Sequence, residues 1–457
     1  MEHLGISFQL ENRPALDGGF VPFGAWRSAY LAKAEQPVRI AVERPDGMRA
    51  VFALHLRGEA YGAANLHFLE RTVKLLLWCV GGSRVLICGC DALTAQLQRI
   101  YSPGGARAFD AQFMETVFQR PFRLEAVAER DFPVPCGRGR ARGGHLNGCR
   151  IGFDAGGSDR KVSAVMDGQV LYSEEVVWQP KLERDPEYHF QDILAALHTA
   201  AAHLPRVDAI GVSTAGVLVG NAPMVSSLFR SVPPELLPLT RTIFDRAAEA
   251  MGGVPLVAAN DGDVTALAGA MQLHDGCVLG IAMGTSQAGG YVDGGERLPG
   301  WFNELAFAPV DLSPHAAADE WSGDRGVGGQ YFSQEAAIRL AAAAGIALDD
   351  AMTSAEKLAA VQRRAEAGDQ RALAVFRDMG TYLGHTLPLY AAIYELRHVL
   401  VLGRVASGTG GEVLVEQCRR VLAEEYPALA GLSITLPDEA FRRVGQSVAA
   451  AGLPVVE

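Results

Sequence analysis

Two short stretches of the sequence carry glycine turns beside acidic or hydroxyl side chains, a pattern that could bind phosphate. In the first, residues 149–165 (CRIGFDAGGSDRKVSAV), an apolar strand ends at Asp154, and the turn Gly156-Gly157-Ser158 leads into a second strand. A glycine turn leaves successive backbone N–H groups exposed, and these can form a nest for an anion. A carboxylate at its mouth can reach a phosphate-bound Mg²⁺ through water. The pattern suits a nucleotide triphosphate, although Gly-Gly between two strands is more often an ordinary hairpin turn.

The second stretch, residues 276–295 (GCVLGIAMGTSQAGGYVDGG), repeats this arrangement. An apolar strand leads into Gly284-Thr285-Ser286, and another strand follows around Tyr291. Two glycine-hydroxyl turns of this kind, with an acidic strand end between them in sequence, are hard to explain as independent hairpins. The pair predicts a phosphate held between two lobes.

The acidic strand end lies between these two turns. A predicted strand, residues 255–259, runs directly into Asn260-Asp261-Gly262-Asp263 and then into the helical segment VTALAGAMQL. Open α/β sheets place their chemistry at the carboxyl ends of such strands. We expect Asp263 to cap the helix, because an Asp side chain can accept from the N–H groups of the first turn. That would leave Asp261 to project into a cleft, although Asp-Gly is also a common tight turn.

A third glycine-rich loop lies near the end of the chain. A buried strand at 399–402 is followed by Gly403, by Ser407 and Gly408, and by a helix predicted to begin near Glu412. Glycines at a strand end beside a helix N-terminus would let a flat adenine and its ribose approach the backbone. The alternative is a flexible strand-to-helix loop.

Composition restricts the class of protein. With 457 residues the chain should hold two or three domains, and 49% hydrophobic and 20% charged residues are typical of a soluble globular protein. A net charge of −11 argues against nucleic acid or an anionic membrane as partner. The sequence shows neither a membrane-length apolar run nor a signal pattern in MEHLGISFQLENRP, so we expect a cytoplasmic protein.

The seven cysteines do not suggest a disulfide framework, and reduced thiols are expected. Cys136, His145 and Cys149 surround the stretch GRGRARGGH, but they lack the paired C-x-x-C spacing of a structural zinc site. Residues 1–135 predict a small α/β domain, with strands at 38–42, 50–56 and 85–88 and helices at 63–80 and 92–101. Residues 136–148 are rich in Gly and Arg and predict a linker.

The motifs taken together resemble the ROK group of sugar kinases (repressor, open reading frame, kinase), within the actin-like ATPase and sugar kinase superfamily. DAGGSDRK resembles the family's first phosphate motif, and GVSTAGVLVGN its glycine loop near the sugar. AANDGDVTALAGA is similar to the strand-end catalytic motif, and MGTSQAGGYV to the second phosphate motif. The resemblance runs from about residue 149 to the C-terminus, and four motifs in the right order make it specific.

The resemblance implies a role for each matching residue. Asp261 would be the catalytic base, and Asn260, Glu304 and Gly216 would bind the sugar. ATP would be the phosphoryl donor, with Mg²⁺ near Asp154, bound through water. The following residues would hold the nucleotide: Asp154, Gly156, Gly157, Ser158, Gly284, Thr285, Ser286, Gly403, Ser407 and Gly408.

The sequence also departs from the family pattern. Phe307 stands where the family has the His of its Gly-Glu-x-Gly-His segment, and no cysteine follows before Cys418. The family's zinc site is therefore not expected, and the sugar contacts would differ, with an aromatic face replacing one hydrogen bond. The loop 311–330, which holds Trp321, could line a sugar pocket with that ring stacked on the sugar. The alternative is a solvated surface loop anchored by the Trp.

The implied fold class is α/β, a two-lobed actin-like ATPase (ribonuclease H-like) fold preceded by the small N-terminal α/β domain. The first lobe would comprise residues 149–260 and about 437–457, and the second residues 261–436. The predicted function is ATP-dependent phosphorylation of a sugar or sugar-like polyol. The alternative is a non-catalytic sugar or nucleotide sensor that signals through residues 1–135, which lack the winged helix of the family's repressors. The resemblance also suggests a homodimer.

Overall fold

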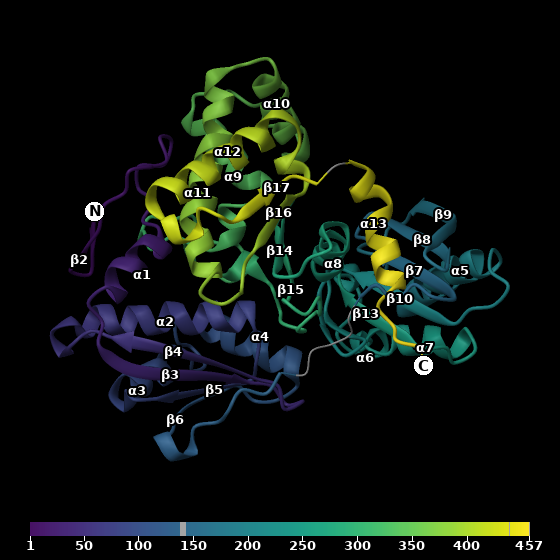
Figure 1. Ribbon diagram of the computed structural model, residues 1–457, viewed down its shortest axis with the longest axis horizontal. Helices are drawn as coiled ribbons and strands as arrows, with labels where there is room; N and C mark the ends of the chain where they lie inside the picture. Colours follow the sequence, from purple (N-terminus) through teal and green to yellow (C-terminus); the bar gives the residue numbers. More distant parts are fainter. Residues whose placement is uncertain (138–142, 438, 457) are drawn as a thin grey trace. The chain divides into compact units, whose positions relative to one another are not determined.

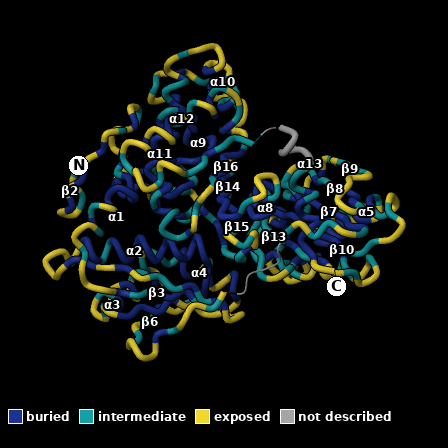
Figure 2. The backbone as a smooth tube through the Cα atoms, viewed as in Figure 1, coloured by how far each residue is buried: buried dark blue, intermediate teal, exposed yellow. Residues whose placement is uncertain are grey.

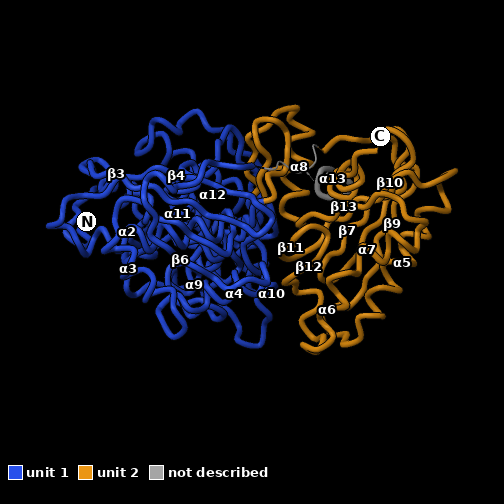
Figure 3. The backbone as a smooth tube through the Cα atoms, turned by 90° about the horizontal axis from the view of Figure 1, so that it is seen from below, with its two compact units in different colours: residues 1–138, 281–289, 301–436 blue, residues 139–280, 290–300, 437–457 orange. Residues whose placement is uncertain are grey.

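The computed structural model describes residues 1–137, 143–437 and 439–456, with the backbone alone for 439–444 (Figure 1). The chain forms two compact units, each described separately below (Figure 3). Unit 1 comprises residues 1–138, 281–289 and 301–436, and unit 2 comprises residues 139–280, 290–300 and 437–457. The centre of the predicted linker, residues 138–142, lies outside the described residues.

These units differ from the predicted domains in two respects. Residues 1–138 fall in unit 1 together with residues 301–436. Residues 261–280 and 290–300, which were expected in the second lobe, belong to unit 2 with the first predicted lobe. The chain passes between the units within two strands, β14 (Val278–Met283) and β15 (Gln287–Val292).

Unit 2 is built on a five-stranded sheet in the order β13-β10-β7-β8-β9. The central strands β7, β10 and β13 are parallel, while β8 and β9 form an antiparallel meander beside β7. All residues of β7 and β10 are buried (Figure 2), as expected for strands covered on both faces. The elements of unit 2 are β7 (Cys149–Ala155), β8 (Asp159–Met166), β9 (Gln169–Val177), α5 (Pro186–Ala201), β10 (Ala209–Thr214), β11 (Val217–Val219), β12 (Ala222–Val225), α6 (Leu237–Thr240), α7 (Ile243–Ala250), β13 (Leu256–Asn260), α8 (Asp261–Leu273) and α13 (Glu439–Ala451).

The two faces of this sheet are used differently. Ile151 and Phe153 of β7 join a hydrophobic core with side chains of α5 and α7. Because side chains alternate along a strand, Gly152 and Asp154 point to the opposite face, which α13 covers. A Cβ on Gly152 would overlap the carbonyl oxygen of Ser447, and one on Gly211 would overlap that of Ala450. Glycine at both positions therefore lets α13 lie directly on the sheet.

Residues of unit 1 take part in two four-stranded sheets. One has the order β15-β14-β16-β17, and the other, built from the N-terminal region, has the order β4-β3-β5-β6 with α2 running across it (Figure 1). The N-terminal elements are β1 (Glu2–His3), β2 (Ile6–Ser7), α1 (Phe23–Leu31), β3 (Gln36–Glu43), β4 (Arg49–Leu56), α2 (Gly62–Cys79), β5 (Arg84–Cys88), α3 (Asp91–Ile100), α4 (Ala108–Phe118) and β6 (Arg123–Ala126). The remaining elements are α9 (Gln334–Ala343), α10 (Ser354–Glu366), α11 (Gln370–Tyr390), β16 (His398–Leu402), α12 (Gly408–Glu425) and β17 (Ser433–Thr435).

Two predicted helix boundaries were wrong. Asn260, not Asp263, is the N-cap of α8, and its Oδ1 accepts from the N–H of Gly262 at 2.8 Å. Helix α12 begins at Gly408 and not near Glu412. Gly410 lies within this helix, and its backbone packs closely on α11. A Cβ at this position would lie 2.8 Å from the ring of Phe376.

Candidate functional site

Asp154 stands at the carboxyl end of β7, on the face of the sheet that α13 covers. Its side chain is 8% exposed, and Ser213 Oγ on the neighbouring strand donates to its Oδ1 at 2.7 Å. Parallel pairing aligns these two residues, because Ser213 lies opposite Asp154 in the register of β7 and β10. Burial raises the pKa of Asp154 to about 7; the Ser213 hydrogen bond lowers this pKa, and the nearby Asp261 charge raises it.

Asp261 is the first residue of α8, directly after β13. It is half-buried, and its Oδ1 accepts from the Gly262 N–H at 2.9 Å. Burial raises the pKa of Asp261, while the hydrogen bond from the Gly262 amide lowers it. The position at a helix N-terminus favours a carboxylate. The helix-capping role predicted for Asp263 is filled by Asn260, and Asp263 instead accepts from the backbone N–H of Tyr291 at 3.1 Å.

Two polar residues that sequence reasoning missed connect the two aspartates. Gln446 of α13 donates from Nε2 to Ser213 Oγ at 3.0 Å and to the backbone oxygen of Asp261 at 3.3 Å. Ser213 in turn donates to Asp154. A serine near the end of the mostly apolar strand AIGVST was the local signal for this network. Gln446 gave no signal, because its helix is distant in sequence.

Asn260 and Gly216 lie together in unit 2, as predicted for two sugar-binding residues. Asn260 Nδ2 donates to the carbonyl oxygen of Gly216 at 2.8 Å. Gly216 has a φ of +110°, and a Cβ there would overlap the Val225 carbonyl oxygen, so glycine is required. The Gly216 carbonyl oxygen therefore orients Nδ2 of the Asn260 amide, and the Gly262 N–H at the start of α8 orients its Oδ1.

The first predicted phosphate turn is anchored by a tryptophan. Trp178 Nε1 donates to the carbonyl oxygen of Gly156 at 2.7 Å, and its backbone N–H donates to the oxygen of Ser158 at 3.2 Å. A second side chain lies against the turn: a Cβ on Gly157 would be only 2.6 Å from the ammonium nitrogen of Lys181. Sequence reasoning missed Lys181, which adds a positive charge to this turn.

Unit 1 holds the second turn and the proposed adenosine loop at the ends of neighbouring strands. Thr285 and Ser286 are exposed between β14 and β15, and the N–H of Gly284 donates to the Ser286 oxygen at 2.9 Å. Gly403 follows β16, which pairs with β14, and has a φ of +90°. A Cβ on Gly403 would overlap the carbonyl oxygen of Met283. The two glycine segments therefore pack backbone to backbone.

Ser407 and Gly408 begin α12. Ser407 Oγ accepts from Gln362 Nε2 at 3.0 Å and donates to the Arg404 oxygen at 2.7 Å. Gly408 has a φ of +62°. The predicted nucleotide residues of unit 1 thus lie on one sheet edge and the adjoining helix start.

Glu304 and Phe307 are also in unit 1, on a short 3-10 turn, Leu305–Phe307, that Glu304 caps. The ring of Phe307 stacks on Trp78 of α2 with centroids 4.2 Å apart. In the following loop Trp321 is 68% exposed, whereas the side chain of Asp324 is only 9% exposed and forms ion pairs with the N-terminal region. The expectation of a solvated surface loop was therefore wrong at Asp324, because cations of α2 and of the segment leading into α4 bury its carboxylate.

Comparisons with known proteins identify the fold. No family model matches the sequence, and neither does any curated protein. Solved structures do match. A ROK family glucokinase from Streptomyces griseus, in complex with glucose and AMPPNP, superposes with a TM-score of 0.50 at 20% identity, covering 66% of this chain and 98% of that one. A ROK hexokinase from Thermus thermophilus gives 0.51 at 22% identity, covering 67% and 97%. The chain has the fold of the ROK-family sugar kinases.

The same fold occurs in a regulator. A ROK family transcriptional regulator, a homologue of the E. coli MLC protein, matches with a TM-score of 0.53 at 17% identity, covering 68% of this chain and 79% of that one. The ROK fold alone therefore does not separate a kinase from a sensor. The matched share leaves about a third of this chain for an additional region, as the sequence predicted.

Two further observations concern membranes and metals. Within residues 1–137, 143–437 and 439–456, no helix is both long and apolar enough to cross a membrane. Over the same ranges, no three His, Cys, Asp or Glu side chains gather into a group that could hold a metal ion. The thiols of Cys136 and Cys149 are free.

Proposed function

We propose that this protein is an ATP-dependent kinase that phosphorylates a hydroxyl group of a sugar or sugar-like polyol. The observation that carries the proposal is the hydrogen-bonded chain from Asp154 through Ser213 and Gln446 to the backbone of Asp261. It links the Asp154 carboxylate to the backbone of Asp261, and both acidic residues lie at the carboxyl ends of parallel strands, on a fold shared with sugar kinases. An ordinary tight turn would not need a buried and a half-buried acid, each with a raised pKa.

Asp261 is the proposed general base, which takes the proton of the attacking hydroxyl. Its raised pKa supports this role, because a base works best when its pKa lies nearer the working pH. Such a base contributes roughly 10²–10⁴-fold in rate. Asn260, oriented by Gly216, and Glu304 are the proposed partners of the sugar hydroxyls.

The oxygen donors of unit 2 fit Mg²⁺, which prefers carboxylates and water. Asp154 would hold the ion. ATP would supply the phosphoryl group, and Mg²⁺, when bound, would neutralise charge on its phosphates. Backbone N–H groups and hydroxyls of the turns at 156–158 and 284–286 would bind phosphate oxygens, and the Lys181 ammonium would add attraction at the first turn. Gly403, Ser407 and Gly408 would accommodate the adenosine.

The second candidate is a sugar sensor without catalysis. The match to a ROK transcriptional regulator favours it, as does the placement of the N-terminal region in one compact unit with Glu304. Under this reading the aspartates would bind ligand without turnover.

The deciding experiment is ADP release from Mg-ATP by the full chain, against a panel of hexoses, amino sugars, pentoses and inositols. Asp261→Asn should abolish sugar-dependent release while leaving the melting temperature shift produced by Mg-AMPPNP intact. Asp245→Asn, which changes an exposed carboxylate in the same unit, is the matched control and should keep full activity. An unchanged rate in Asp261→Asn would refute the proposed base. Stabilisation by a sugar without any release would favour the sensor.

A further inference from the structure

We propose that the N-terminal region, residues 1–137, is a positioning element of the sugar site. It would hold the segment 302–307 in place and with it Glu304. This inference rests on the proposed function for the role of Glu304. It concerns only contacts inside unit 1, to which both parts belong.

The end of helix α2 is completed by this segment. The last carbonyl groups of a helix have no partners within it. Here the backbone N–H groups of Phe302, Asn303 and Glu304 donate to the carbonyl oxygens of residues 80, 79 and 78, at 3.3, 3.0 and 3.0 Å. Three successive hydrogen bonds fix the backbone on which Glu304 stands, and a shift of the helix end would move that backbone with it.

Aromatic stacking holds both ends of the segment. Phe307 stacks on Trp78 with centroids 4.2 Å apart and an interplanar angle of 26°. Phe302 stacks on Phe118 of α4, with centroids 5.3 Å apart and nearly parallel rings. The ring of Phe307 also lies within 6.3 Å of that of Phe113. Aromatic pairs have preferred ring orientations, and they stabilise more than the burial of their surface alone would. The segment 302–307 is therefore held in a defined position against α2 and α4.

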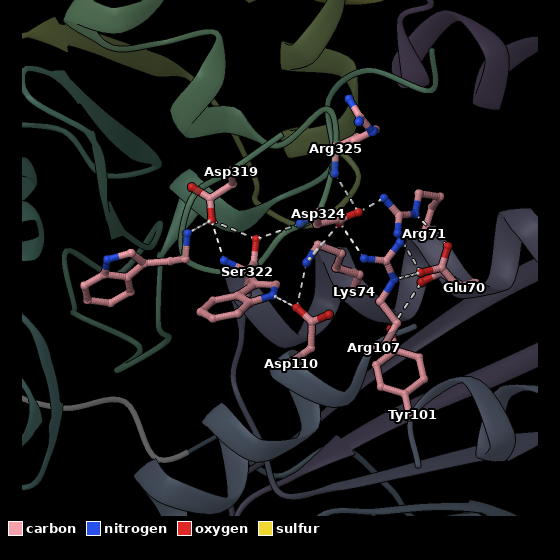
Figure 4. A network of polar contacts seen from close by, with 12 residues as sticks. Glu70, Arg71, Lys74, Tyr101, Arg107, Asp110, Asp319, Ser322, Asp324 and Arg325 are labelled. Carbon is pink, nitrogen blue, oxygen red and sulfur yellow. Dashed lines mark hydrogen bonds and ion pairs between the residues drawn. The ribbon is translucent and has the colours of Figure 1, made fainter. Parts of the chain in front are cut away.

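A buried ionic network fixes the loop that follows (Figure 4). The Asp324 carboxylate pairs with Lys74 at 3.2 Å, Arg71 at 3.2 Å and Arg107 at 2.6 Å. Lys74 has no exposed side-chain surface and also pairs with Asp110 at 2.6 Å. Glu70 pairs with both arginines, so three cations meet three carboxylates. Charges buried in this way hold their partners firmly, because separating them leaves a charge unpaired.

Trp78 joins the network to the segment. Its Nε1 donates to Asp110 Oδ1 at 2.5 Å, while its ring stacks on Phe307 and its carbonyl oxygen accepts from Glu304. Trp78 of the N-terminal region therefore contacts the segment 302–307 through both its side chain and its backbone. This makes Trp78 the positioning residue to test.

The stretch between the segment and the loop is also attached. Phe23 donates its backbone N–H to the Val310 oxygen, and Leu312 donates to the Val21 oxygen, both at 2.8 Å. The Asp311 carboxylate accepts from the Val21 N–H at 2.8 Å. Contacts with residues 1–137 thus extend from Phe302 to Asp324.

The test compares Trp78→Leu, which removes the stack on Phe307, with Trp78→Phe, which keeps an aromatic ring. Phe307→Leu removes the same stack from the other side and serves if the first variant folds poorly. Phe132→Leu is the matched control, because Phe132 is a buried aromatic of the N-terminal region in a separate cluster with Ala41 and Leu86. Steady-state kinetics use the substrate that wild type phosphorylates best in the panel of hexoses, amino sugars, pentoses and inositols. Hydrogen exchange follows the amides of residues 302–304.

Trp78→Leu and Phe307→Leu should each raise the sugar KM on the order of 10-fold or more, with little change in the KM for Mg-ATP, because a small misplacement of a binding group is costly. Combining them should add little, because both remove one contact. Trp78→Phe should recover most of the affinity, and Phe132→Leu should match wild type. The backbone amides of residues 302–304 should lose protection from hydrogen exchange only in Trp78→Leu and Phe307→Leu.

An unchanged sugar KM in both stack variants, with amides 302–304 as protected as in wild type, would overturn the inference. A fall in kcat alone, from less folded enzyme, would also count against it. If wild type phosphorylates none of the hexoses, amino sugars, pentoses and inositols of the panel, the proposed function fails separately. Hydrogen exchange still decides whether the N-terminal region holds the segment, and unchanged protection refutes it.

Discussion

Replacing Asp154 by Asn should make the protein more stable while disabling it. The wild-type carboxyl is buried, and its pKa is raised from 3.8 to about 7. A carboxyl whose pKa is raised by folding stabilises the folded state most when protonated, and this contribution is lost as the pH rises from about 4 to about 7. Asn keeps the shape and can still accept from Ser213 Oγ, but it never ionises.

The size of the effect follows from the pKa. Each unit corresponds to about 1.4 kcal/mol, and two units separate pH 5 from the raised pKa. The difference in free energy of unfolding between Asp154→Asn and wild type should therefore grow by about 3 kcal/mol between pH 5 and pH 8, in favour of the variant. Above pH 8 it should stay constant. In melting temperature this is roughly 2–4 °C for each kcal/mol.

The assay is thermal and urea unfolding of both proteins from pH 5 to pH 9, in EDTA and without nucleotide. Asp245→Asn, which changes an exposed carboxylate of the same unit, is the control, and the difference between it and wild type should not grow with pH. Asp261→Asn should lower the pKa of Asp154, because the Asp261 charge helps to raise that pKa. The pH range over which the free energy of unfolding falls should therefore shift to lower pH. A stability difference between Asp154→Asn and wild type that does not change with pH would refute the reasoning.

Three further substitutions test other parts of the fold. Gly211→Ala should destabilise unit 2 by about 1–3 kcal/mol or more, because its Cβ meets the Ala450 carbonyl oxygen; urea unfolding should show this loss, and Gly62→Ala, with open space around it, should not. Asp324→Ala should cost about 3–5 kcal/mol in calorimetry, because it leaves three buried cations with only two carboxylates, Glu70 and Asp110; a loss near zero would mean that the network is not formed in solution. Thr353→Ala should cost about 0.5–2 kcal/mol by removing the capping box of α10, with sugar and nucleotide KM values unchanged.

Local sequence patterns determined much of this protein. Strand periodicity and glycine turns located β7, β8, β14 and β15 around the two predicted phosphate turns. The capping box of α10 is local in the same sense, since its two hydrogen bonds join Thr353 and Glu356, only three residues apart. The order of four motifs was enough to predict the ROK fold, which the solved structures confirm.

Contacts between distant segments were decided only by the tertiary structure. Ser213 meets Asp154 because β10 pairs in parallel with β7. Gln446 donates to Ser213 and to the backbone of Asp261 because its helix, α13, packs on Gly152 and Gly211. Sequence reasoning also placed residues 1–135 in a separate domain, whereas they share a compact unit with residues 301–436. A local pattern specifies which face of an element is apolar, but not which remote segment covers it. That choice depends on packing and charge pairing over the whole chain, as the seat of Phe307 on Trp78 illustrates.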